Sequence, residues 1–286
     1  MQQRRTTLND GYTLPQLGYG VWQVPDEEAE QVVGAALEAG YRHIDTARAY
    51  GNEAGVGRAI ARAAIPKDEI CIATKLWNAD QGYDSTLEAA EASRRRLEVE
   101  YIDLYLIHWA MPARQLYRDT WRAFVELQQR GTVRSIGVCN FPERQLDEII
   151  ADTGVTPAVH QIELHPFFNQ AAMRQTNAER GIVTEAWSPL GQGGDILRNE
   201  QIVRIAATHE ATPAQVVLAW HLALDNVVIP KSVTPSRIVE NFRAQDIHLS
   251  AADVQAINSL DNGGRIGADP AEANHLTPRG RFHFEV

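Results

Sequence analysis

The stretch IDLYLIHWAMPARQLYRDTWRAFVELQQRGTVRSIGV, residues 102–138, contains one complete repeat of the pattern that decides the fold. Its first six residues, 102–107, are mostly apolar, and such short runs are typical of buried strands. The segment 116–130 carries apolar residues at helical spacing and closes with Gly131, a residue common just after helices. A second short apolar run follows at 135–138. This succession of strand, helix and strand predicts that the two strands are parallel.

The same alternation continues in both directions from this stretch. Further helical segments are predicted at 26–39, 86–97 and 213–224. Together with the two strands above, the remaining short apolar runs give eight strands, and the others lie at 17–20, 42–45, 70–74, 159–162, 182–184 and 227–229. Eight strand–helix units predict an α/β protein with a closed (β/α)₈ TIM barrel.

An open dinucleotide-binding sheet is the alternative that we considered for this alternation. Its G-x-G-x-x-G fingerprint follows the first strand and opens a helix. The nearest match here is residues 18–23, which has Gln23 where the third glycine belongs. The absence of the fingerprint favours the closed barrel.

The two ends of the chain differ from the barrel pattern. Residues 6–8 and 12–14 flank an Asn-Asp-Gly turn at 9–11, which predicts an N-terminal β-hairpin that plugs the barrel floor. The tail 262–286 is rich in Gly, Pro and Asn and is predicted to be loop-like. We therefore expect one barrel domain over residues 1–286.

Composition and charge limit the possible partners. The 286 residues carry a formal net charge of −10, which disfavours a nucleic-acid partner. No apolar run is long enough to span a membrane, and the basic N-terminus is not followed by an apolar stretch. The two cysteines, Cys71 and Cys139, cannot form a disulfide framework. We expect a cytoplasmic protein. The sequence does not show its oligomeric state, and we expect a monomer.

Polar residues follow several predicted strands, where barrel active sites lie. Asp45, Lys75 and His108 come at strand ends, and Tyr50 lies in the loop after the second strand. A nearby ammonium stabilises a phenolate, so Lys75 would make the Tyr50 hydroxyl a better proton donor, with Asp45 as counter-charge. His108 would orient a substrate oxygen. This combination indicates reduction of a carbonyl group.

Other interpretations remain for these residues. Each of the four side chains alone could serve packing or an ordinary ion pair. A metal-dependent barrel hydrolase is a second enzyme class, but His160 and His165 lie five residues apart across a strand end and should not bind one ion. A third class is a regulatory barrel that binds a dinucleotide without turnover. Steady consumption of the reduced coenzyme would separate the enzyme from that sensor.

Several motifs resemble the signatures of the aldo-keto reductases, in the same order and with the same spacing. They are DTARAYGNE at 45–53, TKLW at 74–77, LIHW at 106–109, GVCNF at 137–141 and IPKSVTPSRI at 229–238. The resemblance extends from about Leu8 to Asp261 and, within the family, points to the bacterial diketogluconate reductases through residues 10–11, 15–20, 41–47 and 161–166. It implies a catalytic tetrad of Asp45, Tyr50, Lys75 and His108, with Tyr50 as the general acid.

The resemblance also implies NADPH as the cofactor, extended across the barrel mouth. Cys139, where the family usually has Ser, would hold the nicotinamide carboxamide with Asn140 and Gln161, and Trp187 would stack on the ring. The remaining contacts are assigned to the pyrophosphate (Ser188, Leu190, Gly191), the 2′-phosphate region (Lys231, Ser232, Val233, Thr234, Arg237) and the adenine (Glu240, Asn241).

The substrate pocket is predicted less completely. Trp22, Trp77 and Trp109 stand at three strand ends, where their indoles could surround a small aldehyde or ketone beside His108. A diketogluconate or a related dicarbonyl or keto-sugar is the expected class of substrate. The sequence names neither the physiological carbonyl compound nor the degree of preference for NADPH over NADH.

Overall fold

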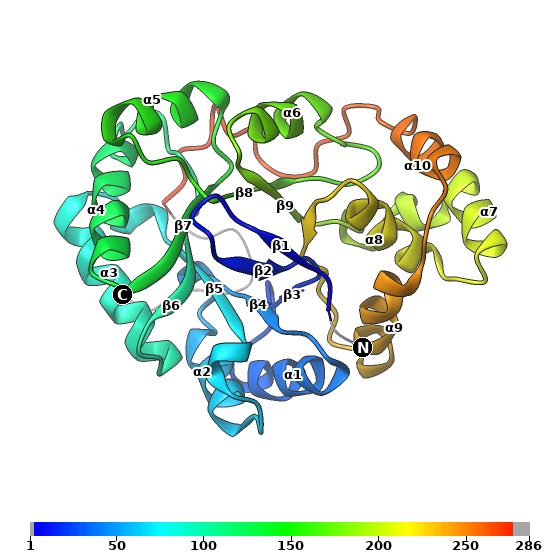
Figure 1. Cartoon of the computed structure of the whole chain (residues 1–286), viewed down its shortest axis with the longest axis horizontal. Helices are drawn as coiled ribbons and strands as arrows, with labels where there is room; N and C mark the ends of the chain where they lie inside the picture. Colours follow the sequence, from blue (N-terminus) through cyan, green and yellow to red (C-terminus); the bar gives the residue numbers. More distant parts are fainter. Residues whose placement is uncertain (1–2, 277–286) are drawn as a thin grey trace.

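The computed structural model of the chain describes residues 3–276 and contains an eight-stranded parallel sheet that curls into a barrel (Figure 1). Neighbouring strands in the sheet follow chain order throughout. The strands are β3 (Tyr19–Gly20), β4 (His43–Asp45), β5 (Cys71–Leu76), β6 (Ile102–Ile107), β7 (Val133–Cys139), β8 (Val159–Glu163), β9 (Val183–Trp187) and β10 (Val227–Val228). Each lies at a predicted strand position, so the fold prediction is confirmed.

The two edges of the sheet meet next to β3. Leu17 pairs in parallel with Val228, and Val228 N donates to Gln16 O at 2.8 Å. Each barrel strand is followed by a helix on the outside of the sheet (Figure 1). Apolar side chains of these helices are buried in the core between helix and sheet. These helices are α1 (Asp26–Ala39), α2 (Glu53–Arg62), α3 (Tyr83–Leu97), α4 (Tyr117–Gln129), α5 (Glu143–Thr153), α6 (Ala171–Glu179), α8 (Pro213–Ala223) and α9 (Pro235–Phe242).

The predicted hairpin closes the barrel floor. Strands β1 (Arg5–Thr7) and β2 (Thr13–Pro15) pair antiparallel, and Figure 1 shows them across the barrel. Leu8 and Leu14 of the hairpin pack in the apolar cluster that fills the barrel interior. Buried Asp103 accepts hydrogen bonds from Tyr12 Oη at 3.3 Å and from Lys67 Nζ at 2.7 Å. The floor is therefore sealed by apolar packing and by one buried carboxylate.

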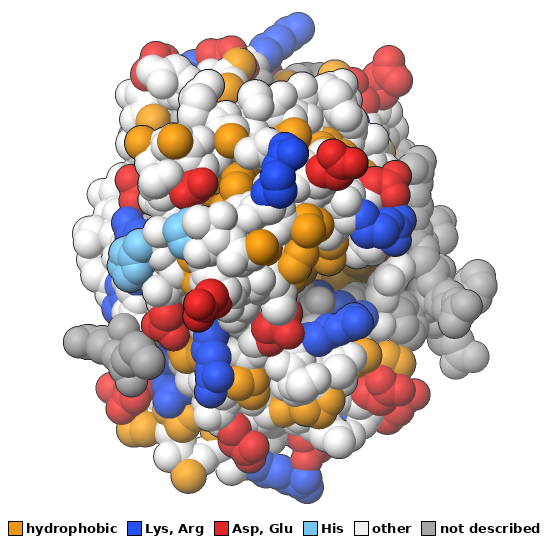
Figure 2. All heavy atoms as spheres, turned by 90° about the vertical axis from the view of Figure 1, so that its right-hand side faces the viewer, with side chains coloured by type: hydrophobic (Ala, Val, Ile, Leu, Met, Phe, Trp, Pro, Cys, Tyr) orange, Lys and Arg blue, Asp and Glu red, His pale blue; other side chains and the backbone are white. Residues whose placement is uncertain are grey.

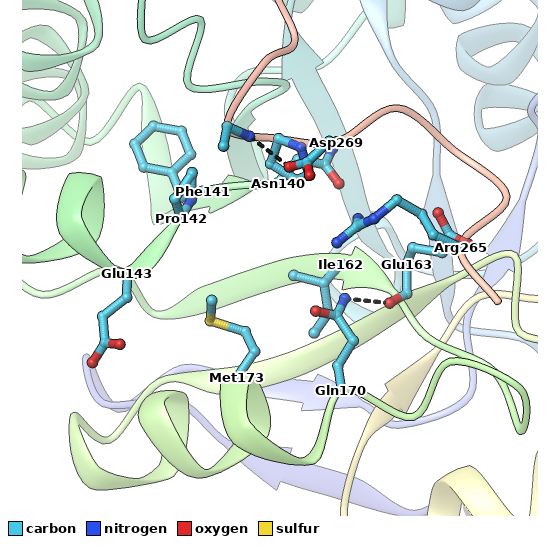
Figure 3. A pocket seen from close by; sticks show the side chains of 12 residues that line it. Asn140, Phe141, Pro142, Glu143, Ile162, Glu163, Gln170, Met173, Arg265 and Asp269 are labelled. Carbon is cyan, nitrogen blue, oxygen red and sulfur yellow. Dashed lines mark hydrogen bonds between the residues drawn. The ribbon is translucent and has the colours of Figure 1, made fainter. Parts of the chain in front are cut away.

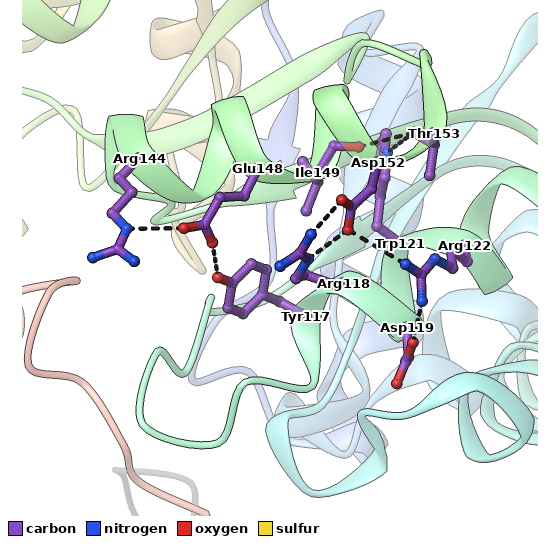
Figure 4. Close-up of polar contacts among 10 residues, drawn as sticks. All are labelled: Tyr117, Arg118, Asp119, Trp121, Arg122, Arg144, Glu148, Ile149, Asp152 and Thr153. Carbon is purple, nitrogen blue, oxygen red and sulfur yellow. Dashed lines mark hydrogen bonds and ion pairs between the residues drawn. The ribbon is translucent and has the colours of Figure 1, made fainter.

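Outer helices are joined by polar contacts as well as by packing. Figure 4 shows α4 and α5 joined by two such groups. Tyr117 and Arg144 both bind Glu148, and Arg118 forms a bidentate ion pair with Asp152. These contacts lie on the outer surface, where exposed ion pairs contribute little stability.

Two further helices, α7 (Glu200–Thr208) and α10 (Ala251–Asn258), pack against each other beside α8. The face over α7, α9 and α10 carries acidic and basic side chains intermixed with small apolar patches (Figure 2). Within residues 3–276, none of the helices has the length and apolar character needed to cross a membrane. Residues 262–276 form neither helix nor strand, as predicted for the tail, and 277–286 lie outside the described residues.

Candidate active site

A buried ion pair lies at the mouth of the barrel. Lys75 near the end of β5 is fully buried, and its Nζ lies 2.6 Å from Asp45 Oδ1 and 2.8 Å from Thr46 O. The register places β4 next to β5, so the two side chains meet although 30 residues separate them. Burial opposes the charge of Lys75, but the Asp45 carboxylate prevails and raises the lysine pKa above its usual range. Lys75 is therefore held as a cation.

Tyr50 and His108 lie above this ion pair. Tyr50 follows β4 in a short 3₁₀ helix, Arg48–Tyr50, and the centroid of its ring is 5.1 Å from Lys75 Nζ. The imidazole of His108, just after β6, packs edge-on against the Tyr50 ring with their centroids 5.8 Å apart. The four residues of the predicted tetrad are thus brought together from three strand ends.

The acidity of Tyr50 differs from the sequence-based expectation. Burial raises its pKa to about 12, and the opposing effect of the Lys75 cation offsets only part of that rise. Lys75 acts in the expected direction, but removal of the phenol from water outweighs it in the protein alone. Tyr50 is therefore fully protonated at neutral pH.

His108 is held as a neutral imidazole. Burial lowers its pKa well below the usual value, and the charge of Lys75 adds to this effect. Its Nδ1 has no hydrogen-bond partner among residues 3–276. A neutral imidazole still donates one N–H, so His108 can bind the oxygen of a carbonyl compound.

Three of the residues assigned to the nicotinamide are engaged with the protein itself. Asn140, with a left-handed φ of 55°, donates to His108 O at 3.0 Å and accepts from Trp187 Nε1 at 2.9 Å. Gln161 donates to Asp45 Oδ2 at 3.0 Å. Cys139 is fully buried and its side chain packs in the barrel interior. The structure groups these residues beside the tetrad, with the Cys139 thiol below the mouth.

The residues assigned to the pyrophosphate form the loop after β9. Ser188 has a left-handed φ of 50°, and Gly191 N donates to Ser188 O at 2.9 Å. Gly191 itself has a φ of 58°, and a Cβ there would lie 2.3 Å from Ile196. This left-handed backbone favours glycine at position 191, in the turn that follows Ser188 and Leu190.

The cluster assigned to the 2′-phosphate lies at the N-terminus of α9. Lys231 and Arg237 are exposed, and within residues 3–276 neither makes an ion pair. Thr234 precedes the helix, and its backbone N–H donates to Ser232 Oγ at 3.1 Å. Two available cations beside a helix N-terminus fit a phosphate group.

Two residues assigned to the adenine contact the protein. Glu240 accepts from Thr212 Oγ1 at 2.8 Å, so it also ties α9 to the start of α8. Asn241 is 5% exposed. Val233, in contrast, is exposed beside the cationic cluster.

Two of the three predicted tryptophans pack against the tail. Trp77 and Trp109 pack with Ala273 of the tail, whereas Trp22 lies outside this cluster and is partly exposed. Trp77 Nε1 donates to Leu276 O at 2.9 Å, and the His275 ring lies against Trp109 with centroids 5.3 Å apart. The described wall beside His108 is therefore made by Trp77, Trp109 and the tail, and a place for Trp22 in the same substrate cup stays a prediction.

A cavity of about 210 Å³ lies beside this wall, between the ends of β7 and β8 and the tail (Figure 3). Asn140, Ile162, Gln170 and Arg265 are among its lining residues, whereas none of the tetrad lines it. The cavity is therefore adjacent to the proposed reaction centre and separate from it.

Sequence reasoning gave no role to two buried carboxyl groups, Glu163 and Glu185. Glu163, at the end of β8, accepts from the backbone N–H groups of Ile266 and Gly267 and so attaches the tail. Glu185, in β9, contacts Gln161 beneath the tetrad. An acidic residue within the apolar run 182–186 was the available signal, because unpaired carboxylates are rare in strand interiors. Among the described residues, no group of three or more His, Cys, Asp or Glu could hold a metal ion.

Comparisons with known proteins identify the family. The model of the aldo/keto reductase family matches residues 14–262. The chain belongs to this family. It is 54% identical to an aldo-keto reductase of Mycolicibacterium smegmatis, over 94% of this chain and 98% of the relative. It is 48% identical to the methylglyoxal reductase DkgA of Salmonella typhimurium, over 92% and 95% of the two chains.

A solved structure agrees with this assignment. The crystal structure of a Gox0644 variant in complex with NADPH has a TM-score of 0.92 and 49% identity, covering 96% of this chain and 99% of the other. The family prediction, including the similarity to diketogluconate reductase-like members, is confirmed. The chain is therefore an oxidoreductase of the aldo-keto reductase type.

Proposed function

We propose that this aldo-keto reductase uses NADPH to reduce small aldehydes and ketones, with Tyr50 as the proton donor. The observation that carries the proposal is the buried contact of 2.6 Å between Lys75 and Asp45, directly below Tyr50 and His108. A buried ion pair is costly to desolvate, so its position beneath a phenol and an imidazole is consistent with a chemical role.

The residues act on the substrate oxygen. When bound, NADPH supplies the hydride that the carbonyl carbon takes up. Neutral His108 donates a hydrogen bond to the carbonyl oxygen, and the Tyr50 hydroxyl gives its proton to that oxygen as negative charge develops. The Lys75 cation stabilises the resulting phenolate, and Asp45 keeps Lys75 charged. Trp77, Trp109 and the tail limit the access of water to this site.

The cofactor assignment rests on two features of this chain. Lys231 and Arg237, exposed beside the N-terminus of α9 and without an ion pair to any described residue, suit the 2′-phosphate that distinguishes NADPH from NADH. Trp187 offers an indole face beside Asn140, with its ring fixed by a hydrogen bond of 2.9 Å. The NADPH-bound structure of a relative with 49% identity supports the same assignment.

Small α-dicarbonyl compounds are the proposed class of substrate. The relatives include methylglyoxal reductases, and the wall of Trp77, Trp109 and Ala273 leaves a compact, apolar site beside His108. Keto-sugar acids related to diketogluconate, in which the two ketone groups are not adjacent, are the second candidate class.

A substrate screen tests the proposal. Purified protein with NADPH is offered methylglyoxal, phenylglyoxal, simple aldehydes and 2,5-diketogluconate, and NADPH absorbance is followed. We expect turnover with several of them and the highest kcat/KM with an α-dicarbonyl. Tight NADPH binding without any turnover would instead favour a non-catalytic sensor.

A further inference from the structure

A second carboxyl group lies below the proposed catalytic tetrad. Glu185 is fully buried in β9 and is the register partner of Gln161 in β8, so the two side chains face the barrel interior together. The Gln161 amide nitrogen donates to Asp45 Oδ2 at 3.0 Å and to Glu185 Oε2 at 2.9 Å. Both N–H groups of this amide are therefore used by carboxyl groups, and its oxygen remains to accept a hydrogen bond.

The other oxygen of Glu185 faces a histidine. Oε1 lies 3.6 Å from Nε2 of His43, and both groups are fully buried. Among residues 3–276, neither Glu185 Oε1 nor His43 Nε2 has a hydrogen-bond partner, while the imidazole also interacts with the backbone of Pro15. A carboxylic acid proton on Oε1, directed at Nε2 of a neutral imidazole, would satisfy both atoms if they moved together by about 0.4–0.9 Å.

The charges around Glu185 favour the protonated form. Among the described residues, Lys75 is the cation that acts on Glu185, and Asp45 already neutralises it. A further carboxylate would be a buried charge without a counter-ion, which is costly. The titratable groups that face Glu185 are Asp45 and His43 from β4, Lys75 and Cys71 from β5, and Cys139 from β7.

The pKa shifts of Glu185 and its neighbours also favour a proton on Glu185. Burial, and then the charge of Asp45, raises the pKa of Glu185 to about 8. Burial lowers the pKa of His43 to about 4, so the shared proton belongs to Glu185. Burial also raises the pKa of both thiols well above their usual value, which leaves them uncharged.

We propose that Glu185 is a positioning residue that works as a neutral carboxylic acid, fixing the Gln161 amide and leaving Lys75 and Asp45 as the only charge pair beneath Tyr50. The Gln161 oxygen is then directed to the nicotinamide carboxamide. This inference rests on the proposed function for its kinetic consequence, but the protonation of Glu185 does not depend on it.

Ionisation of Glu185 should lower the rate of carbonyl reduction. Above about pH 8 a second negative charge would lie close to Lys75 and Asp45. Lys75 would then stabilise the Tyr50 phenolate less, so Tyr50 would become a weaker acid. The rate of carbonyl reduction should therefore fall as the pH rises through about 8, well before Tyr50 itself titrates.

The variant Glu185→Gln tests this directly. Glutamine reproduces a protonated carboxyl, because its oxygen can accept from Gln161 while its NH₂ donates to His43. At pH 7, where Glu185 of the wild-type protein is mostly protonated, we expect kcat and the Kd of NADPH of the variant to lie within about twofold of wild type. At about pH 9.5 the variant should be roughly tenfold faster than wild type, whose rate has declined. The control Glu38→Gln, on the exposed face of α1, should keep the wild-type pH profile.

A spectroscopic titration makes the test independent of turnover. In protein without cofactor, the infrared carbonyl band of a protonated carboxyl should be present at pH 7, disappear with a midpoint near 8 and be absent from Glu185→Gln. If the variant does not fold, the wild-type titration alone still decides the protonation state.

The experiments distinguish a wrong role for Glu185 from a wrong proposed function. A wild-type protein without that band at pH 7, or a variant with the wild-type alkaline decline, overturns the role of Glu185. A protein that shows the band but consumes no NADPH with any carbonyl compound overturns the proposed function alone.

Discussion

At the scale of single residues, the site depends on which groups lose contact with water. Lys75 keeps its charge in the barrel interior because Asp45 lies 2.6 Å away, whereas burial raises the pKa of Tyr50 to about 12. The ammonium and the phenol are close enough to interact, with Nζ 5.1 Å from the ring centroid. In the proposed mechanism, the substrate oxygen would take its proton from a phenol that is less acidic than free tyrosine.

The variant Tyr50→Phe removes only the proton donor. We expect reduction to fall by about 100-fold or more, because general acids contribute roughly 10²- to 10⁴-fold. The Kd of NADPH, measured by quenching of tryptophan fluorescence, should stay within about twofold of wild type. A variant that retains full activity would contradict the assignment of Tyr50.

The double variant Lys231→Ala with Arg237→Ala tests the phosphate site. Both side chains are exposed at the N-terminus of α9, so their removal should leave the barrel folded. We expect the Kd of NADPH to rise by about 10-fold or more, since hydrogen bonds to charged groups contribute roughly 1.5–3 kcal/mol. The Kd of NADH should change little, and equal weakening of both coenzymes would show that the 2′-phosphate lies elsewhere.

At the scale of elements, the tail is attached to the barrel by a few specific contacts. Glu163 accepts from the backbone of Ile266 and Gly267, with 2.7 Å to the latter, and Trp77 holds Leu276 O. A Cβ on Gly267 would lie 2.5 Å from Trp187, so the tail also touches the proposed nicotinamide platform. A segment without helix or strand thus borders both proposed binding sites.

The variant Glu163→Gln should loosen this attachment. Its NH₂ group would face one of the two backbone N–H groups, which leaves that donor without an acceptor. We expect the KM for carbonyl substrates to rise about fivefold, which corresponds to roughly 1 kcal/mol. Protease cleavage of the tail should accelerate. Glu143→Gln, an exposed carboxylate that lines the same cavity, is the matched control and should behave as wild type.

The tail attachment should also depend on pH in a defined direction. Burial opposes the charge of Glu163, but hydrogen bonds from His165, Ile266 and Gly267 prevail and lower its pKa below the usual value. A lowered pKa in the folded state means that the carboxylate stabilises the fold above its unfolded pKa, near about 4.3, and loses that effect as the pH falls. Protease cleavage of the tail should therefore be constant from pH 8 to about 5 and increase only below about 4. An increase near neutral pH would assign the attachment to another group.

At the scale of the whole molecule, the barrel is sealed at one end and carries the proposed active site at the other. The hairpin and Asp103 close the floor, while the strand ends at the mouth bring together side chains from β4 to β9. We propose that hairpin and barrel form one folding unit, because Asp103 binds the hairpin, the loop before β5 and strand β7 at once.

The variant Asp103→Asn tests that unit. The loss of the carboxylate leaves Lys67 and Arg134 without their buried partner, which should cost about 2 kcal/mol, less than a fully buried pair because both cations are partly exposed. Urea unfolding followed by tryptophan fluorescence and by circular dichroism should give coincident transitions at a lower midpoint. Separate transitions for the two signals would show that hairpin and barrel unfold independently.

The sequence by itself determined the order and type of the elements. Apolar periodicity is a local property, so strands such as 102–107 and helices such as 26–39 were predicted close to their observed bounds. The rule that barrel sites lie at strand ends then grouped Asp45, Lys75 and His108 before any coordinates. The order and spacing of the motifs then added Tyr50 to this group and indicated the aldo-keto reductase family.

Only the tertiary structure decided what each buried polar group contacts and whether it carries a charge. Periodicity does not show that Gln161 bridges Asp45 and Glu185, that Glu163 binds the tail, or that Trp77 and Trp109 pack against Ala273. Such contacts join residues distant in sequence, and the pKa of a group depends on the water and charges around it in three dimensions. For this reason the acidity of Tyr50 and the role of Glu185 follow from the folded barrel alone.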